Sequence, residues 1–153
     1  MEKICCFTGH RSIESADKAA VTAALRRVLP ELIKEGVTVF RTGGALGFDM
    51  LAAEEILRLK RNFPKVKLHI YVPCLDQNKY YTPEQKVVYL RHINAADKIM
   101  CISKSYYNGC MLERNRQMVN GSEYCVAYLR KQSGGTAFTV NYAEKNGVRV
   151  IKL

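Results

Sequence analysis

The sequence lacks the features that mark secreted, membrane-spanning or zinc-stapled proteins. No apolar run approaches the roughly 20 residues that a membrane span needs, and the apolar start reaches Gly9 too soon for a secretory signal. None of the six cysteines forms a C-x-x-C pair, so we predict reduced, buried thiols and no metal site. We therefore expect a cytoplasmic protein with no membrane partner.

Repeats, low-complexity segments and linkers are also missing. The chain has 153 residues, 48% hydrophobic and 25% charged, which is typical of one soluble globular domain. We predict a single domain over residues 1–153.

Acidic residues are scarce relative to basic ones. The formal net charge is +10, which attracts anions such as nucleotides, nucleic acid or acidic lipid. The densest stretch, residues 58–67, contains no long block of like charge, so a solvated basic face is favoured there over a nucleic-acid site.

Short apolar segments alternate with amphipathic ones along the whole chain. The apolar segments are rich in β-branched residues and apolar on both faces, which is typical of a parallel sheet covered by helices. The fold class is therefore α/β, a single Rossmann-like three-layer domain with a mainly parallel sheet of about six strands and helices on both faces. The expected strands are residues 3–8, 37–42, 67–72, 97–102, 123–129 and 148–153, and the expected helices are residues 15–35, 48–61, 82–93, 111–119 and 136–145.

Local signals refine three of these boundaries. Pro30 is expected to kink or split the first helix, and Pro73 to end the third strand. Thr82 and Gln85 form a capping-box pattern at the start of the third helix.

Ligands of parallel sheets bind beyond the carboxyl ends of the strands, so the loops there carry the candidate site. Three loops join a strand to a helix with glycines and polar side chains, a pattern that favours phosphate binding at helix N-termini. Arg114 and Asn115 on the fourth expected helix complete the set, while Tyr80, Tyr81, Tyr106 and Tyr107 are placed to flank a base. The predicted ligand-binding residues are Thr8, Gly9, His10, Arg11, Gly43, Gly44, Gly47, Asp49, Arg114, Asn115, Gly134, Gly135 and Thr136.

Alternatives remain for each loop. Asp49 either favours the helix dipole, holds a ribose hydroxyl or positions Arg11, and Thr136 is expected to cap the last helix. Each loop is also compatible with a plain turn.

Four blocks taken in order, residues 8–11, 43–49, 114–119 and 134–136 with Tyr142-Ala143, resemble the YpsA-like branch of the SLOG superfamily over nearly the whole chain. The superfamily includes DprA and LOG proteins, and the resemblance implies a Rossmann-like fold that binds a nucleotide-derived ligand at the glycine loops. LOG enzymes are phosphoribohydrolases with a signature similar to P-G-G-x-G-T-x-x-E. The corresponding stretch here, residues 133–140, lacks the proline and the glutamate.

Three functions follow in order of preference. The first is binding or sensing of a nucleotide-derived, phosphate-bearing ligand, such as ADP-ribose, NAD or a nucleoside phosphate, in a regulatory role. The second is an N-glycosidic hydrolase of the LOG type, with Asp49 and Arg114 as the candidate catalytic residues. Binding of single-stranded DNA in the manner of DprA ranks last, and we expect no nucleic-acid partner, because no strand face interleaves basic and aromatic residues. A homodimer is a further expectation, since related Rossmann-like proteins often pair.

Overall fold

The computed structural model describes residues 2–153 and has the predicted α/β architecture. Strands and helices alternate throughout, as the apolar pattern indicates. The elements are β1 (Lys3–Gly9), α1 (Ser15–Lys34), β2 (Val37–Thr42), α2 (Phe48–Lys60), β3 (Lys67–Cys74), α3 (Pro83–Ala95), β4 (Lys98–Ser103), α4 (Cys110–Val119), β5 (Tyr124–Tyr128), α5 (Gly135–Lys145) and β6 (Arg149–Lys152).

The strands form one parallel sheet in the order β4-β3-β2-β1-β5-β6. The chain builds outward from β1 to β4, then returns to place β5 on the other side of β1. The strand order therefore reverses between β1 and β5, and a crevice opens there at the carboxyl ends of the strands.

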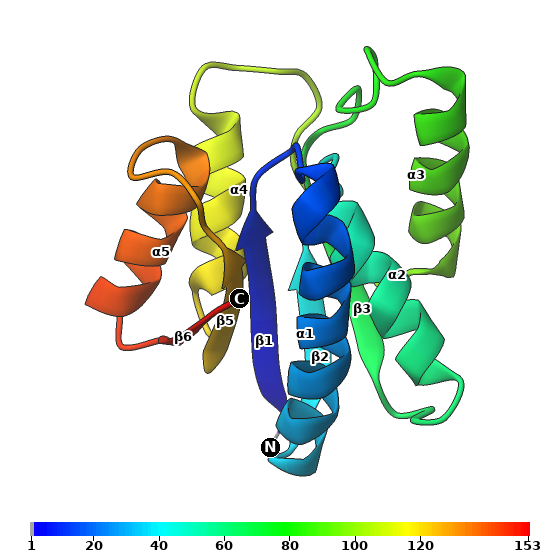
Figure 1. Ribbon diagram of the computed structural model, residues 1–153. Coiled ribbons are helices and arrows are strands. Elements are labelled where there is room, and N and C mark those ends of the chain that lie inside the picture. The colour runs from blue at the N-terminus through cyan, green and yellow to red at the C-terminus, as the bar shows by residue number, and fades with distance from the viewer. Residues whose placement is uncertain (1) are drawn as a thin grey trace.

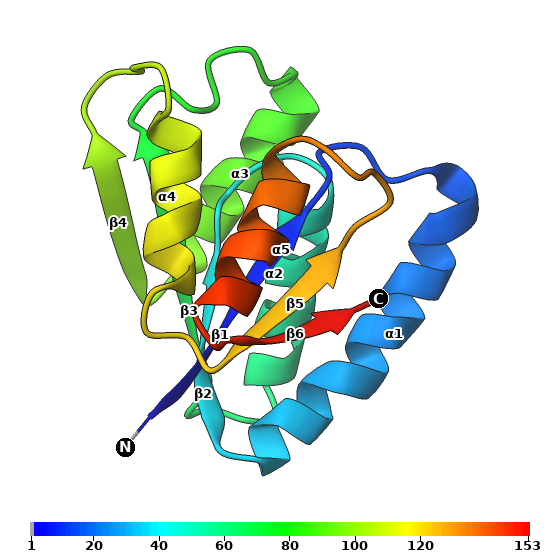
Figure 2. The same cartoon turned by 90° about the vertical axis from the view of Figure 1, so that its left-hand side faces the viewer.

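Helices cover both faces of this sheet. α1, α2 and α3 lie on one side, and α4 and α5 lie on the other (Figures 1 and 2). The larger apolar core lies under α1 and α2 and includes Phe7, Phe40 and Phe48, which are fully buried. A smaller core lies under α4 and α5 around Met118 and Cys125. The Rossmann-like three-layer prediction is confirmed.

Two prolines do not interrupt their helix or strand as the sequence predicts. α1 runs through Pro30 without a break, because Leu25, Leu29 and Leu32 are buried on both sides of it and hold the helix against the sheet. β3 continues through Pro73 to Cys74. Its pairing with β2 ends at Ile70, so the missing proline N–H removes no bond on that side.

The start of α3 follows the sequence prediction. The Gln85 N–H donates to Thr82 Oγ1 at 3.2 Å, and the Thr82 N–H donates to Gln85 Oε1 at 2.9 Å. This reciprocal pair is the predicted capping box.

Five of the six cysteine thiols are buried, and Cys101 is exposed. Within residues 2–153, no helix combines the length and apolarity that crossing a bilayer requires.

Candidate functional site

A cavity of about 620 Å³ opens at the crevice between β1 and β5. Its walls come from the loop after β1, the start of α2, the N-terminal half of α4 and the loop between β5 and α5. Ten of the predicted residues line it, namely Thr8, Gly9, His10, Arg11, Asp49, Arg114, Asn115, Gly134, Gly135 and Thr136.

The loop after β1 presents His10 in one protonation state. His10 Nε2 accepts a hydrogen bond from the Arg130 backbone N–H at 2.8 Å, and the ring packs edge-on against Tyr128. Burial lowers the pKa of His10, and the positive charges of Lys131 and Arg130 lower it further. The imidazole is therefore neutral at neutral pH with its proton on Nδ1, which leaves Nδ1–H as a donor.

Arg11 lies exposed at the mouth of the cavity. Its Nη2 group is 2.6 Å from the sulfur of Met111 on α4. A thioether is a weak acceptor, so an anionic group that enters the mouth is a better partner for this guanidinium.

Arg114 is the buried cation of the site, with only 5% of its surface exposed. Its Nη1 group donates to the carbonyls of Gly43 and Tyr71, and its Nε donates to Asn115 Oδ1 at 2.8 Å. Asn115 is held in turn by Thr139 of α5, whose hydroxyl accepts from Nδ2 at 2.9 Å. Nη2 of Arg114 makes no hydrogen bond with any residue in the range 2–153, so it is available to a ligand.

Asp49 is the buried anion of the site, with 6% exposure. Burial raises its pKa to about 6, although Arg114 and hydrogen bonds from the backbone of Ala45 and Gly43 act in the opposite direction. Gly43 lies between the two charged groups: a Cβ there would be 2.6 Å from Arg114 Nη1 and 2.7 Å from Asp49 Oδ2. The bare glycine backbone thus lets the carboxylate and the guanidinium face the same point.

The three predicted glycines of the turn between β2 and α2 do not line the cavity. Gly43, Gly44 and Gly47 are absent from its wall, where Ala45 lies instead. The carbonyl of Gly44 accepts from the hydroxyl of Tyr81 at 3.1 Å. Gly47 packs against the backbone of Arg11, and the next N–H, that of Phe48, donates to the His10 carbonyl at 3.1 Å. The Gly44 carbonyl and the Phe48 N–H are therefore bonded within the protein, and the binding role of these glycines stays a prediction.

The turn between β5 and α5 is open. Gly134 and Gly135 line the cavity, and a Cβ on either would meet no atom within 4 Å. α5 begins at Gly135 with Gly134 as its N-cap, so Thr136 lies inside the first turn and is not the cap that we predicted. The first N–H groups of α5 have no partner within the helix and can bind an anion.

Several lining residues were not among those predicted from the sequence. Gly109 precedes α4 with φ of 96°, and with Met111 it brings a second helix N-terminus to the cavity. Glycine directly before a helix is the signal that marks this turn. Arg130, Lys131 and Ser133 also contribute, and their position beside the Gly134-Gly135 pair pointed to them.

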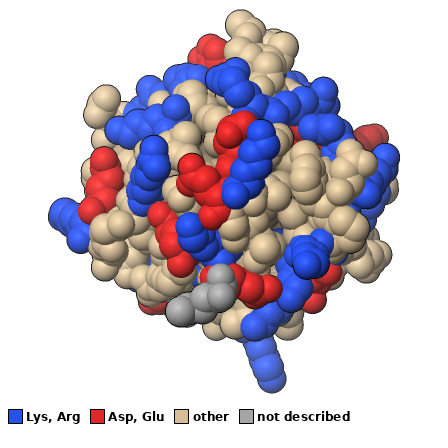
Figure 3. All heavy atoms as spheres, turned by 90° about the horizontal axis from the view of Figure 1, so that it is seen from below, with Lys and Arg blue, Asp and Glu red and all other residues tan. Residues whose placement is uncertain are grey.

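Positive charge exceeds negative charge around this cavity. The lining carries Arg11, Arg114, Arg130 and Lys131 against Glu14 and Asp49. The amino-end face of the molecule differs, because its lysines and arginines are interspersed with acidic residues (Figure 3). An anion-binding surface is therefore better supported at the carboxyl edge.

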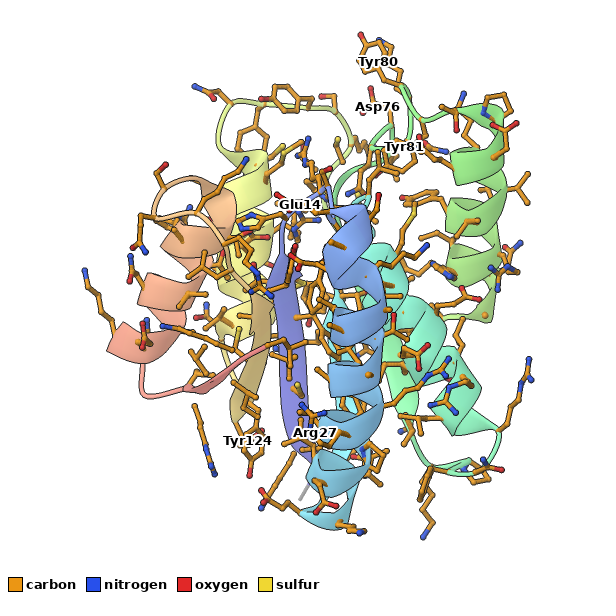
Figure 4. The ribbon with its side chains drawn as sticks, in the orientation of Figure 1. Glu14, Arg27, Asp76, Tyr80, Tyr81 and Tyr124 are labelled. Carbon is orange, nitrogen blue, oxygen red and sulfur yellow. The ribbon has the colours of Figure 1, made fainter. Side chains whose placement is uncertain are left out.

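The side chains in Figure 4 show the two ends of the molecule. Glu14 lies near the carboxyl end of β1, whereas Arg27 and Tyr124 lie toward the opposite end. Tyr80 projects above the loop after β3 and is 89% exposed, while Tyr81 points down toward the site.

Known proteins resemble the chain along most of its length. The SPbeta prophage-derived protein YoqJ of Bacillus subtilis is 34% identical over 134 residues, covering 79% of this chain and 78% of YoqJ. A UPF0398 protein of Brevibacillus brevis is 28% identical over 130 residues, covering 83% of this chain and 69% of that protein.

Two solved structures share the fold. The DNA processing protein A (DprA) of Streptococcus pneumoniae superimposes with a TM-score of 0.70 at 14% identity, covering 99% of this chain and 50% of that one. DprA of Helicobacter pylori gives 0.68 at 23% identity, covering 98% and 64%. This chain thus spans half to about two thirds of each DprA chain.

These neighbours correct one expectation. From the sequence we expected no nucleic-acid partner, and that expectation is wrong, because the fold is shared with DNA processing proteins and the Helicobacter structure concerns single-stranded DNA binding. Three exposed tyrosines, Tyr80, Tyr106 and Tyr107, lie on the loops after β3 and β4 and not on a strand face.

The family assignment is direct. A family profile matches residues 5–150, nearly the full chain, and the match includes all four sequence blocks that resemble the YpsA-like branch. The chain belongs to the YspA SLOG family.

Proposed function

We propose that the cavity binds a nucleotide-derived ligand through its phosphate. The observation that carries the proposal is Arg114, a buried guanidinium whose Nη2 group has no hydrogen bond within residues 2–153 and whose side chain lines the cavity. Asp49 is the buried anion near it, and phosphate is a suitable further partner because the guanidinium donor that remains free forms strong charge-assisted hydrogen bonds with phosphate oxygens.

The surrounding groups support an anionic ligand. The N-termini of α4 and α5 both border the cavity, and free N–H groups at helix starts bind phosphate. Arg11 and Lys131 add charge at the mouth without holding the fold together, because both are exposed.

Asp49 supports a ribose next to the phosphate. An ionised carboxylate repels phosphate but accepts hydrogen bonds from hydroxyl groups. Asp49 borders the same cavity as Arg114, so a ligand with both a phosphate and a sugar diol uses both charges. Nucleoside phosphates, ADP-ribose and NAD have this combination.

The test is calorimetric titration of the full chain with AMP, ADP, ADP-ribose, NAD and inorganic phosphate at fixed salt. We expect at least one nucleotide to bind, and Arg11→Ala to weaken it by about tenfold, the usual effect of losing a charged hydrogen bond. Arg27→Ala is the matched control, because it removes an equal charge from an exposed residue at the far end of the molecule. Equal losses in both variants, or no binding by any nucleotide, would overturn the proposal.

Hydrolysis of the bound nucleotide is an alternative function of the same site. A carboxyl group with a pKa of about 6 is suited to proton transfer near neutral pH, and Asp49 has that property. In this reaction water adds across the N-glycosidic bond of a nucleoside monophosphate, Asp49 supplies the proton to the leaving base, and free base and ribose 5-phosphate result. Chromatography that detects free base with the wild type and none with Asp49→Asn supports hydrolysis; intact nucleotide in both leaves binding alone.

Single-stranded DNA is the second candidate ligand. Tyr80 is 89% exposed, and Lys79 lies 5.5 Å from its ring centre. Stacking of bases on exposed aromatic rings beside cations is the usual mode of sequence-tolerant single-strand binding.

Fluorescence anisotropy with a labelled oligothymidine at two salt concentrations tests this candidate. Binding that falls steeply with salt, weakens in Tyr80→Ala and persists in Arg27→Ala supports it. A signal that Tyr80→Ala leaves unchanged removes it.

A further inference from the structure

The residues proposed to bind phosphate form only part of the cavity wall, and the remaining part is apolar or aromatic. Tyr106, Met111 and Leu112 line the cavity where the loop after β4 joins α4. These three side chains are apolar or aromatic and lie within seven positions of one another in the sequence. The wall therefore has an apolar section beside its cationic one.

No other side chain among residues 2–153 stacks on the ring of Tyr106. It is 58% exposed although it borders a cavity, and within residues 2–153 it takes part in no aromatic pair, cation–π contact or hydrogen bond. Tyr128, the other tyrosine of the cavity wall, differs, since its ring stacks on Phe48. Stacking of a flat group on an aromatic ring is stabilising, so the ring of Tyr106 is available to stack on a flat ligand group.

A local hydrogen bond closes a turn at each end of the loop that carries Tyr106. Ser103 Oγ donates to the Ser105 carbonyl at 2.7 Å, and the Cys110 N–H donates to the Tyr107 carbonyl at 3.1 Å. A loop restricted by such bonds loses less conformational entropy when a ligand binds, which favours affinity. Met111 is an adaptable neighbour, because its unbranched thioether side chain can repack against an aromatic ligand.

We infer that Tyr106, with Met111 and Leu112, forms a subsite for the aromatic base of the ligand, so that the cavity selects nucleotides over sugar phosphates. This inference rests on the proposed phosphate site and adds the part of the ligand that the phosphate site does not read. Tyr106 is the specificity-determining residue of the subsite.

The experiment compares ribose 5-phosphate with four nucleoside monophosphates, which all share a phosphate and a ribose. Calorimetric titration gives the ratio of the ribose 5-phosphate dissociation constant to that of each of AMP, GMP, CMP and UMP. We expect the wild type to prefer at least one nucleotide by about fivefold or more, the lower end of what stacking on one aromatic side chain contributes. Tyr106→Ala should bring the ratio close to one, and Tyr106→Phe should keep it.

Tyr107→Ala is the matched control. Tyr107 is the adjacent residue and is 45% exposed, but it does not line the cavity, so its removal should leave the ratio unchanged. If ribose 5-phosphate binds as well as every nucleotide, or if Tyr106→Ala keeps the preference, the base subsite is wrong while the phosphate site stands. If no probe binds, the phosphate site itself is wrong and the subsite falls with it.

Discussion

Two glycine-rich turns follow strands of the same sheet at the same edge, yet they differ in what surrounds them. The turn between β2 and α2 contains Gly43, Gly44 and Gly47, and protein atoms lie within contact distance of a Cβ at each one. The turn between β5 and α5 contains Gly134 and Gly135, and a Cβ on either meets nothing within 4 Å. The first turn is closed by the protein, and the second is open to the cavity.

The position of each strand explains the difference. β2 lies inside the sheet between β1 and β3, so the loops of both neighbours pack over its turn. β5 lies between β1 and the edge strand β6, and among residues 2–153 no neighbouring loop packs over Gly134 or Gly135 of its turn. A strand–glycine–helix pattern is therefore compatible with close packing as well as with ligand access, and the neighbours in the sheet determine which applies.

The largest predicted loss of stability comes from a substitution in the closed turn between β2 and α2. Gly47→Ala should lower the free energy of unfolding by about 4 kcal/mol, because φ of 78° strains any side chain and the new methyl group overlaps the backbone of Arg11. Urea denaturation measures the loss. Gly147→Ala is the control, since φ of 75° is nearly the same but no atom lies within 4 Å of its Cβ. It should cost about 1 kcal/mol, the backbone strain alone, and equal losses at both positions would contradict the closed turn.

The next effect concerns the charge that the closed turn buries. The pKa of Asp49 rises from 3.8 to about 6 on folding, so its contribution to stability is present below the unfolded value and is lost as pH rises through 6. This shift of about two units corresponds to about 3 kcal/mol. The stability of Asp49→Asn relative to the wild type should therefore increase by about that amount between roughly pH 4 and pH 8. Urea denaturation at each pH measures the difference, and a difference that does not vary with pH would show that Asp49 is not desolvated.

A smaller effect is expected where the closed turn meets the cavity. Gly43→Ala places its methyl group between Arg114 and Asp49, and displacing these side chains should cost about 2 kcal/mol of stability. AMP binding should be lost in the same variant, because the guanidinium moves. Calorimetric titration below the unfolding temperature checks this, and unchanged AMP affinity would show that Arg114 does not bind the ligand.

The smallest effect on stability belongs to the open turn. Gly135→Ala should change the free energy of unfolding by no more than about 0.5 kcal/mol, and the change should be toward greater stability, because alanine is the better helix residue and has space here. Its affinity for AMP should fall if the first turn of α5 binds phosphate. A loss of stability in Gly135→Ala would show that this turn is packed like the first one. An unchanged affinity of the variant for AMP would show that the first turn of α5 does not bind the phosphate.

The elements and their order were predictable because their signals are local. Apolar segments with the right spacing marked each strand and helix, and Thr82 with Gln85 marked a helix start correctly. Pro30 and Pro73 were misjudged because their effect depends on contacts with segments distant in the sequence: the leucines of α1 are buried in the core shared with the sheet, and the pairing of β3 with β2 ends at Ile70, before Pro73. The homodimer stays a prediction.

The candidate site was predictable in part for the same reason. Residues that follow strands of a parallel sheet meet at one edge, so the alternating pattern was sufficient to bring His10, Arg114 and Gly134 together. Burial and pairing depend on atoms from several segments at once. Only the folded chain leaves Nη2 of Arg114 without a hydrogen bond among residues 2–153, separates Asp49 from solvent and places the backbone of Arg11 beside Gly47. The pattern of residues specifies which groups reach the edge of the sheet, whereas packing specifies which of them remain open to a ligand, because packing is a property of neighbours that the linear order does not contain.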